Sequence, residues 1–499
     1  MLESYLLGIQ SVMAADVLIA IAAAVPIGLT FGLLPGLSGL TALAVLLPLV
    51  YGMEPLVGLA FLLAAHAVIY TGGSMTTILL GIPGSPPNAA TLLDGRPMAL
   101  NGEAGRAVGA ALAASGLGGL IGVVALLLLI PVVQPVIVFL GSPEIFCLSL
   151  LGISYIALIG RGDLVKGLAA GGFGIFLSCF GYQDISGVPR FWSGSDYLLD
   201  GFRLVPLVLG MFAIPEIVDL ATSNRQRAPI APGSVDARSL WHGARDVLVR
   251  RWLLLRSAWI GVLVGLIPGV GGDTAPFIAY GSARQWAREP SRFGSGIVDG
   301  VIAPEASNNA KEGGALVPTL ALGIPGSAGM VLLLGGFLLL GLQPGIGFLD
   351  DHADTAVALA LVLALANVLA VIVMFGAARF VVRLLDVRRE LLAGPLLVLV
   401  VLGAYTVEQN TLDVLFVLVF GVLGCCMRNL DYSRPALLLG FVLGPTMETY
   451  LHISMQAYGY AFLLRPGVLI ILFFIVAGFA GPVFRRYRVN RIRSDHGPS

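Results

Sequence analysis

A glycine–proline motif that occurs twice constrains the fold of this chain more than any other feature. Residues 32–42 read GLLPGLSGLTA, and residues 265–275 read GLIPGVGGDTA. A second motif, GIPGS, occurs at residues 81–85 and again at residues 323–327. Each half of the chain therefore carries the same two motifs in the same order, which indicates an internal repeat.

Each motif lies within apolar sequence and is predicted to interrupt a helix at membrane depth. Proline removes a backbone donor, and the interruption leaves carbonyl and amide groups that lipid cannot satisfy. Such breaks persist where a polar ligand or ion visits them. Paired interrupted helices in corresponding positions of two halves are typical of the binding site of a secondary transporter.

The composition indicates a membrane protein without reference to any motif. Hydrophobic residues make up 57% of the chain, charged residues 12%, and the mean hydropathy is +0.92. A soluble chain would carry about twice that share of charge. The formal net charge is zero, which gives no reason to expect a nucleic-acid partner. The four cysteines lack the spacing of metal ligands, and we expect them to be packing residues.

Several further motifs occur in a fixed order along the chain. They are GLLPGLSG at 32–39, TGGS at 71–74, GIPGSPPN at 81–88, DGRPM at 94–98, GLIPGVGGD at 265–273 and PEASNNAKEGG at 304–314. Together they resemble the large membrane subunit of tripartite tricarboxylate transporters (TctA), over nearly the whole chain. The resemblance implies carboxylate uptake across the bacterial inner membrane, driven by an ion gradient. It also implies two partners, a small integral membrane subunit and a periplasmic solute-binding protein.

Positive charge predicts which loops face the cytoplasm. In the first half, the predicted cytoplasmic segments are those around Arg96 and Arg106, around Arg161 and Lys166, and at 225–256, whereas 141–144 and 184–200 are predicted to be periplasmic. In the second half the signs reverse at the matching places: 284–292, 383–389 and 428–434 are predicted to be cytoplasmic, and 350–354 and 408–413 periplasmic. The sequence thus predicts an all-α polytopic membrane protein with two inverted-topology repeats, a periplasmic N-terminus and a cytoplasmic C-terminus.

The predicted domains follow from this alternation of sides. They are a first transmembrane repeat at 1–222, a basic cytoplasmic linker at 223–256, a second, inverted repeat at 257–465, and a final transmembrane helix with a basic tail at 466–499. Each repeat is expected to contain two re-entrant hairpins that meet near the bilayer midplane, at 17–50 and 72–95 and then at 257–283 and 314–340. The first hairpin is also long enough to cross twice. Part of the linker region, 241–259, is a candidate interfacial helix.

Small polar side chains follow each break, where the N-terminus of a half-helix suits a carboxylate and freed carbonyls suit Na⁺. The predicted substrate-binding residues are Ser74, Thr76, Gly84, Ser85, Asn88, Asn308, Asn309, Lys311, Gly326 and Ser327. The predicted cation-binding residues are Gly36, Ser38, Thr41, Gly269, Asp273 and Thr274. Ser85, which precedes Pro86, is expected to cap its half-helix. The alternative is that Gly and Ser only allow close helix packing.

Charged residues at membrane depth are expensive and are functional candidates. Asp273 is one, and Leu40 occupies its place in the other half, so we expect a cation ligand in one half only. Lys311 either faces an anionic substrate or pairs with Glu305 or Glu312, and pairing is favoured because buried charge is usually compensated. His66 is expected to be a core histidine, with a proton relay as the alternative.

The favoured function is a transporter subunit without a cofactor, coupled to Na⁺ as first choice and to H⁺ as second. A passive anion channel remains open, because paired half-helices also build pores. An intramembrane aspartyl hydrolase would need a second suitable Asp, and a serine hydrolase would need a general base near Ser85 or Ser327. Neither is evident, so we do not expect an enzyme.

Overall fold

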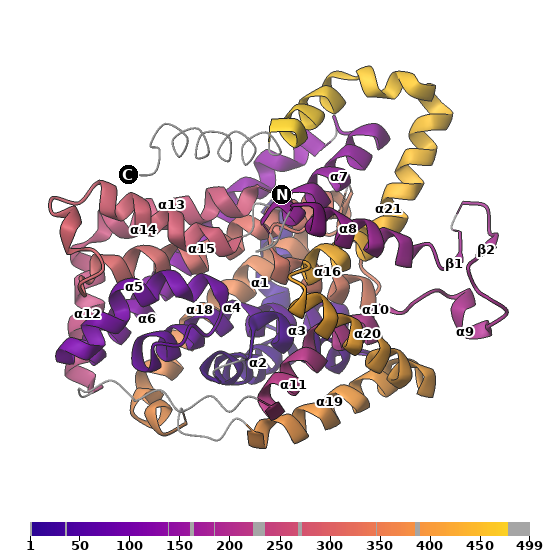
Figure 1. The fold of residues 1–499 in the computed structure, drawn as a ribbon. Coiled ribbons are helices and arrows are strands. Elements are labelled where there is room, and N and C mark those ends of the chain that lie inside the picture. Colours follow the sequence, from indigo (N-terminus) through magenta and orange to yellow (C-terminus); the bar gives the residue numbers. More distant parts are fainter. Residues whose placement is uncertain are drawn as a thin grey trace, which may run out of the picture. The chain divides into compact units, whose positions relative to one another are not determined.

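The computed structural model describes residues 2–34, 37–137, 139–159, 164–183, 185–222, 235–267, 272–345, 347–384 and 390–477. The described chain is almost entirely helical (Figure 1). It divides into two compact units, of which unit 1 comprises Met1–Ile137, Arg203–Ile267 and Gly271–Asn429, and unit 2 comprises Val138–Phe202, Pro268–Val270 and Leu430–Ser499.

Unit 1 contains the helices on either side of each predicted break. Its α-helices are α1 (Leu2–Val12), α2 (Ala15–Leu33), α3 (Gly39–Leu46), α4 (Pro55–Leu80), α5 (Ala89–Met98), α6 (Ala104–Ile137), α10 (Leu204–Val208), α11 (Ile214–Thr222), α12 (Ala237–Val249), α13 (Arg251–Leu266), α14 (Ala275–Gln285), α15 (Asp299–Leu322), α16 (Ala328–Leu339), α17 (Phe348–Asp351), α18 (Ala353–Leu384), α19 (Glu390–Glu408) and α20 (Thr411–Asn429). Its short 3₁₀ turns are η1 (Leu47–Val50), η2 (Pro86–Asn88), η5 (Gly272–Thr274) and η6 (Pro290–Arg292), and its π-helical turns are η3 (Ala99–Glu103) and η4 (Leu209–Ala213).

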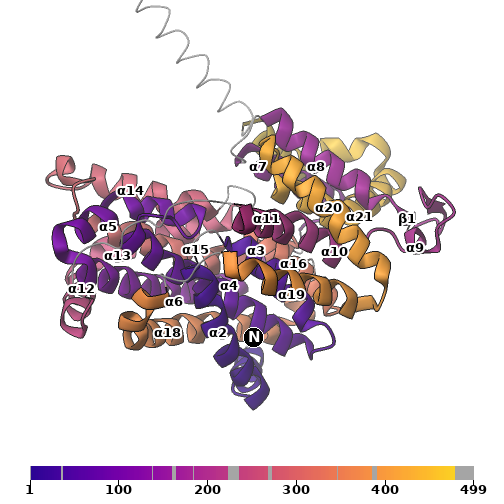
Figure 2. The same ribbon diagram turned by 60° about the horizontal axis from the view of Figure 1, so that its bottom comes forward.

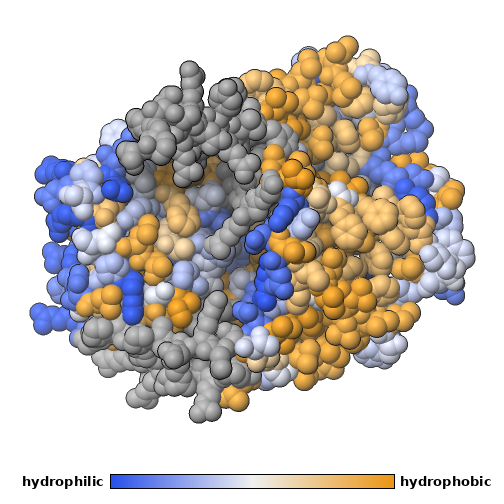
Figure 3. Space-filling model, viewed as in Figure 1, coloured by the Kyte–Doolittle hydropathy of each residue, from blue (hydrophilic) through white to orange (hydrophobic). Residues whose placement is uncertain are grey.

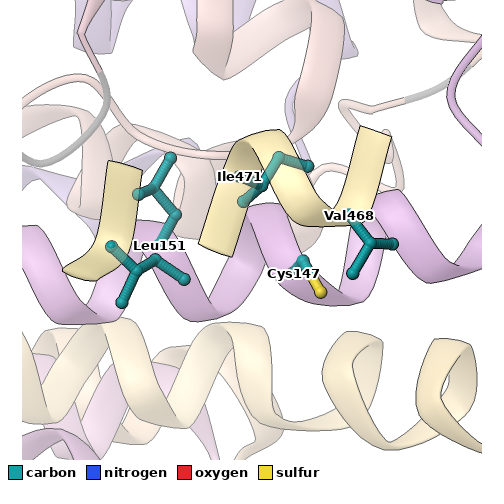
Figure 4. Close-up of a cluster of buried hydrophobic side chains, with 5 residues drawn as sticks. Cys147, Leu151, Val468 and Ile471 are labelled. Carbon is teal, nitrogen blue, oxygen red and sulfur yellow. The ribbon is translucent and has the colours of Figure 1, made fainter. Parts of the chain in front are cut away.

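Unit 2 is built from α7 (Ser142–Ile159), α8 (Leu164–Ser178), α9 (Asp196–Leu199), α21 (Arg434–Tyr458), η7 (Gly459–Leu464) and an apolar helix at Pro466–Ala477. Figure 2 shows α7, α8 and α21 side by side. A short antiparallel pair, β1 (Gly181–Tyr182) and β2 (Pro189–Arg190), completes the unit. Cys147 of α7 lies among Leu151, Val468 and Ile471 (Figure 4), which agrees with its predicted packing role.

Eight described helices are long enough and apolar enough to cross a membrane. Much of their surface is apolar: Leu415, Leu418 and Val422 of α20, for example, are exposed. Figure 3 likewise shows broad apolar areas on the face viewed. Exposed apolar surface of this extent is what contact with lipid requires. The prediction of an all-α multi-pass membrane protein is confirmed.

Two central helices, α4 and α15, are buried in unit 1 over most of their length. Helix α2 and α18 pack against α4, whereas α6, α13 and α14 pack against α15 (Figure 1). Both central helices end at a glycine in the left-handed region, Gly81 with φ 71° and Gly323 with φ 68°. A side chain would be strained there, so glycine is required for the chain to leave the helix at these points.

The start of the predicted second hairpin in each half differs from the structure. We expected one span to end near residue 70 and a new arm to begin at 72, but α4 continues from Pro55 to Leu80, and α15 likewise runs through 313–314. The glycines there serve close packing. A Cβ added to Gly72 would lie 2.6 Å from the carbonyl oxygen of Leu29 on α2.

The predicted interfacial helix at 241–259 is divided between two helices. Asp236 caps the start of α12 through a capping box with Ser239, and Arg250 lies between the end of α12 and the start of α13. Trp241 and Trp252 are exposed, as expected of aromatic residues near a membrane surface.

Candidate translocation site

The first break of each half leaves its helix with the same backbone conformation. Leu34, after α2, has φ −86° and ψ 107°, and Ile267, after α13, has φ −86° and ψ 108°. The tips that follow, which include the predicted ligands Gly36 and Gly269, lie outside the described residues. The chain resumes at Ser38, whose hydroxyl accepts a bond from the Thr41 amide and caps α3, and at η5 before α14.

The second break of each half is also the same in backbone but differs in capping. Ser85 has φ −152° and ψ 164°, and Ser327 has φ −151° and ψ 167°. Ser327 caps α16 by accepting a bond from the Met330 amide, whereas the Ser85 side chain makes no capping bond. Our expectation for Ser85 was wrong: the amide three residues on, which Ser38 and Ser327 bind in their own helices, belongs here to Asn88 and donates to the Ser85 carbonyl oxygen instead. The Ser85 hydroxyl instead donates to Asn88 Oδ1 at 2.5 Å.

The breaks meet in two pairs, each made of segments from different halves. η2 packs against η5, and α3 packs against α16. Glycine makes the approach of each second break to the preceding helices possible. A Cβ added to Gly326 would lie 2.7 Å from both the Ala315 Cα and the Gly265 carbonyl oxygen, and one added to Gly84 would collide with Gly73.

A chain of charged groups lies beside these breaks, centred on Lys311. The Lys311 side chain is fully buried, and its Nζ lies 3.5 Å from Asp273 Oδ1 and 3.6 Å from Glu312 Oε1. Nζ also lies 4.2 Å from the centre of the Tyr70 ring, a cation–π distance. Lys311 is thus compensated internally, as we favoured, and its partners are Glu312 and Asp273.

His66 extends this chain to a second buried group. Its Nε2 lies 3.1 Å from Glu312 Oε2, while its Nδ1 has no hydrogen-bond partner among the described residues. The ring of His66 contacts Gly329 of α16, because a Cβ added to Gly329 would collide with it. A core histidine was expected here. The structure adds that His66 bonds the buried carboxylate of Glu312 on α15 and that its ring contacts the start of α16.

Asn308 is a predicted substrate ligand whose two side-chain polar atoms are both without a partner in the described residues, whereas Asn309 has one such atom, Oδ1. Asn308 is 1% exposed, and neither its Nδ2 nor its Oδ1 has a partner in the described part of the chain. Asn308 and Glu312 are one helical turn apart on α15, so they share a face of that helix. Buried polar groups without partners are rare and mark places where a ligand, ion or water belongs.

The other predicted residues are mostly engaged within the protein. Thr76 Oγ1 donates to the Gly73 carbonyl at 2.8 Å, which matches the common backbone-bonding role of intramembrane threonine. Asn309 Nδ2 donates to Thr71 Oγ1 and to Asn367 Oδ1. Of the predicted cation ligands, Ser38 and Thr41 share a hydroxyl bond of 2.8 Å. Asp273 and Thr274 lie together in η5, with the Asp273 side chain 38% exposed.

The sequence analysis missed a second buried carboxylate site, at Glu305. The carboxylate accepts bonds from Ser74, Thr91 and Ser115 at 2.5 to 2.7 Å. Thr91 and Ser115 are 214 and 190 residues away along the chain, so no local pattern could have identified them. The one available signal was Glu305 itself, an acidic residue within a stretch that we expected at membrane depth.

A comparison with known families identifies the family of the chain. The sequence model described as "Tripartite tricarboxylate transporter TctA family" matches residues 18–439. The chain belongs to the TctA family. It is therefore a subunit of a transporter class built from several components, and the resemblance inferred from the sequence is confirmed.

Two relatives of this TctA family member come from Agrobacterium vitis. One, "Uncharacterized 52.8 kDa protein in TAR-I ttuC' 3'region", is 30% identical over 429 residues, which are 86% of this chain and 85% of that protein. The other, "Uncharacterized protein in TAR-II ttuC' 3'region", is 32% identical over 195 residues, 39% of this chain and 81% of that protein. No solved structure matches the chain.

Proposed function

We propose that this TctA subunit carries organic carboxylates, citrate-like tricarboxylates or related acids, across the bacterial inner membrane by symport with Na⁺ or H⁺. One observation carries the proposal: a fully buried lysine, Lys311, lies beside two pairs of interrupted helices. Lys311 is paired with Glu312 and with the partly exposed Asp273, so a substrate carboxylate that replaces Asp273 would meet the ammonium group and half-helix N-termini at one place. That combination suits a multiply charged anion. The family supplies the two partners, a small membrane subunit and a periplasmic binding protein.

Packing supports two repeats, at 1–222 and 257–465, with the linker 223–256 between them and the final helix and tail at 466–499. Gly32 of α2 faces the Ile69 carbonyl on α4, and Gly265 of α13 faces the Lys311 carbonyl on α15. The matching backbone angles at both breaks of each half also support an internal repeat. A protein without internal symmetry has no reason to repeat these contacts at corresponding positions.

Long-range bonds support the inverted topology with re-entrant hairpins. Each of the following bonds joins residues that loop charge and the predicted alternation of spans place on the same side. On the predicted cytoplasmic side they are Arg106–Asp246, Asp94–Gly296, Arg428–Asp219 and Lys166–Leu430, and on the predicted periplasmic side Gln134–Asp350, Arg203–Asp413, Arg190–Glu448 and Arg465–Glu144. We therefore retain the periplasmic N-terminus and the cytoplasmic C-terminus.

Single cysteines should label from opposite sides of the membrane. In a variant without the native cysteines, Asp196→Cys should react with an impermeant thiol reagent in intact spheroplasts. Asn429→Cys should react only after permeabilisation. Both residues are exposed in the structure, so access across the membrane decides the result. If both positions label from the same side, the inverted topology is wrong.

Within the site, we propose that Asn308, Lys311, Ser327 and Gly326 contact substrate carboxylates. Asn308 offers two polar atoms without partners in the described residues, and α16 begins directly after Ser327, so the N-terminus of this helix lies at Gly326 and Ser327. The second break of the first half, with Ser74, Thr76, Gly84, Ser85 and Asn88, forms the corresponding wall, and Asn309 lies on the neighbouring face of α15. Asp273, Thr274, Ser38, Thr41, Gly36 and Gly269 remain candidates for a coupling cation.

Reconstitution with both partners tests the function. Proteoliposomes that contain this chain, the small subunit and the binding protein should accumulate citrate against its gradient, saturably and only with an imposed Na⁺ or H⁺ gradient. Uptake that never exceeds equilibrium would indicate the passive channel instead. Robust uptake by this chain alone would contradict the proposed need for a binding protein.

A further inference from the structure

Glu305 itself is not among the proposed substrate ligands, although its partner Ser74 is. Glu305 lies on α15 with none of its surface exposed. Ser74 of α4 approaches both carboxylate oxygens at 2.7 Å, Thr91 of α5 approaches Oε1 at 2.5 Å, and Ser115 of α6 approaches Oε2 at 2.7 Å. Four helices therefore converge on one carboxylate through oxygen atoms.

The site holds more close oxygen pairs than it has hydroxyl protons. Ser74 Oγ lies within bonding distance of Oε1, of Oε2 and of the Tyr70 carbonyl oxygen, yet it has one proton to donate. It also accepts a bond from Asn88 Nδ2 at 3.0 Å. With Thr91 and Ser115 donating one proton each, some oxygen lone pairs in this cluster face one another. A positive charge among them would remove that repulsion.

The charges around Glu305 also favour a bound cation. The neighbouring basic group, Lys311, pairs with Asp273 and Glu312. The hydrogen bonds to Glu305 in the described chain come from uncharged groups, namely the hydroxyls of Ser74, Thr91 and Ser115 and the side chain of Asn88. A buried carboxylate without an opposite charge nearby is unfavourable. One carboxylate balances one monovalent cation, and carboxylate, hydroxyl and carbonyl oxygens are the ligands that hard cations prefer.

We propose that Glu305, Ser74, Thr91, Ser115 and the Tyr70 carbonyl form a Na⁺ site. The assignment rests on the proposed function and deepens it, because it names a place for the coupling ion distinct from Asp273. It also moves Ser74 from the substrate wall to the cation.

The site is connected to the second break of the first half. Asn88 of η2 donates to Ser74 Oγ and accepts from Ser85, and Thr91 lies in the first turn of α5, the helix that follows η2. A bound Na⁺ would therefore hold this break against α4, α6 and α15. Because binding free energies are reciprocal, a substrate that favours the same position of the break would in turn favour Na⁺.

Thermal unfolding of the purified chain in lipid nanodiscs tests the site without any transport measurement. At pH 8, increasing NaCl should raise the melting temperature of the wild type relative to choline chloride of equal ionic strength. Glu305→Gln should abolish this difference. Ser115→Ala, a milder change, should raise the Na⁺ concentration for half the effect by about tenfold or more. Ser149→Ala is the matched control, because its buried hydroxyl bonds only the Ile145 carbonyl of its own helix, and it should behave as wild type.

Several outcomes would overturn the Na⁺ site. The first is a Na⁺ effect on the melting temperature that persists unchanged in both Glu305→Gln and Ser115→Ala. The second is a wild type whose melting temperature responds to pH but not to Na⁺. The third is a Na⁺ effect that Asp273→Asn removes and Glu305→Gln does not. Citrate accumulation without any Na⁺-specific stabilisation would leave the proposed function intact and refute the site. Na⁺-specific stabilisation that requires Glu305, without carboxylate transport by the complete complex, would support the site and refute the function.

Discussion

Replacing Lys311 with methionine should abolish carboxylate uptake and strongly destabilise the protein. The change leaves Asp273 and Glu312 without the ammonium group that lies 3.5 and 3.6 Å from them. Removing one partner from a buried ion pair typically costs about 3–5 kcal/mol. The melting temperature in nanodiscs and citrate uptake by the three-component complex measure the two effects.

The chain offers a matched control and a way to separate folding from transport. Lys166, its only other lysine, donates to the Leu430 carbonyl in a more exposed setting, and Lys166→Met should have a small effect on both measurements. The double variant Lys311→Met with Glu312→Gln removes one charge of each sign, so it should recover much of the stability but no uptake. If the double variant transports like the wild type, Lys311 serves folding and not the substrate.

Adding one methyl group at Gly32 or Gly265 should impair the protein nearly as much. A Cβ at Gly32 would collide with the Ile69 carbonyl, and one at Gly265 with the Lys311 carbonyl, so in each case two helices must move apart. Overpacking of this kind costs about 1–3 kcal/mol. We expect Gly32→Ala and Gly265→Ala to lower the melting temperature by similar amounts and to remove most uptake.

Gly281→Ala provides the comparison for these variants. Gly281 lies in α14, and a Cβ added there has open space around it. Because alanine favours helix over glycine by about 0.5–1 kcal/mol, this variant should be at least as stable as the wild type. Wild-type behaviour of Gly265→Ala in both measurements would show that the contact between α13 and α15 is not as close as described.

The positions of the breaks could be predicted from the sequence because proline and glycine act locally. Each proline removes a backbone donor, and Gly81 and Gly323 take the left-handed conformation that only glycine adopts without strain. Whether a helix continues through a glycine was harder to predict than where a helix breaks. Gly72 looked like the start of a hairpin arm, but it lies inside α4, because a glycine that allows close helix packing has the same local signature as one that ends a helix.

The chemistry of the site was predictable only in part. Lys311 had acidic neighbours in sequence, so internal pairing was a reasonable expectation, and Glu312 is indeed one partner. Glu305 was the other candidate, yet it bonds hydroxyls from three helices, which depends on tertiary packing and leaves no trace at short range. The link from His66 to Glu312 likewise spans 246 residues.

The polarity of α15 has a consequence for how the protein is made. This helix carries Asp299, Glu305, Lys311 and Glu312, and it is not among the described helices apolar enough to cross a membrane. A charged residue at the centre of a lone helix adds about 2.5–3.5 kcal/mol to the cost of insertion. The helices that shield it, α6 and α13, both precede it in the chain. We therefore expect α15 to enter the bilayer against helices that are already in place, so that the order of elements along the chain is also an order of assembly.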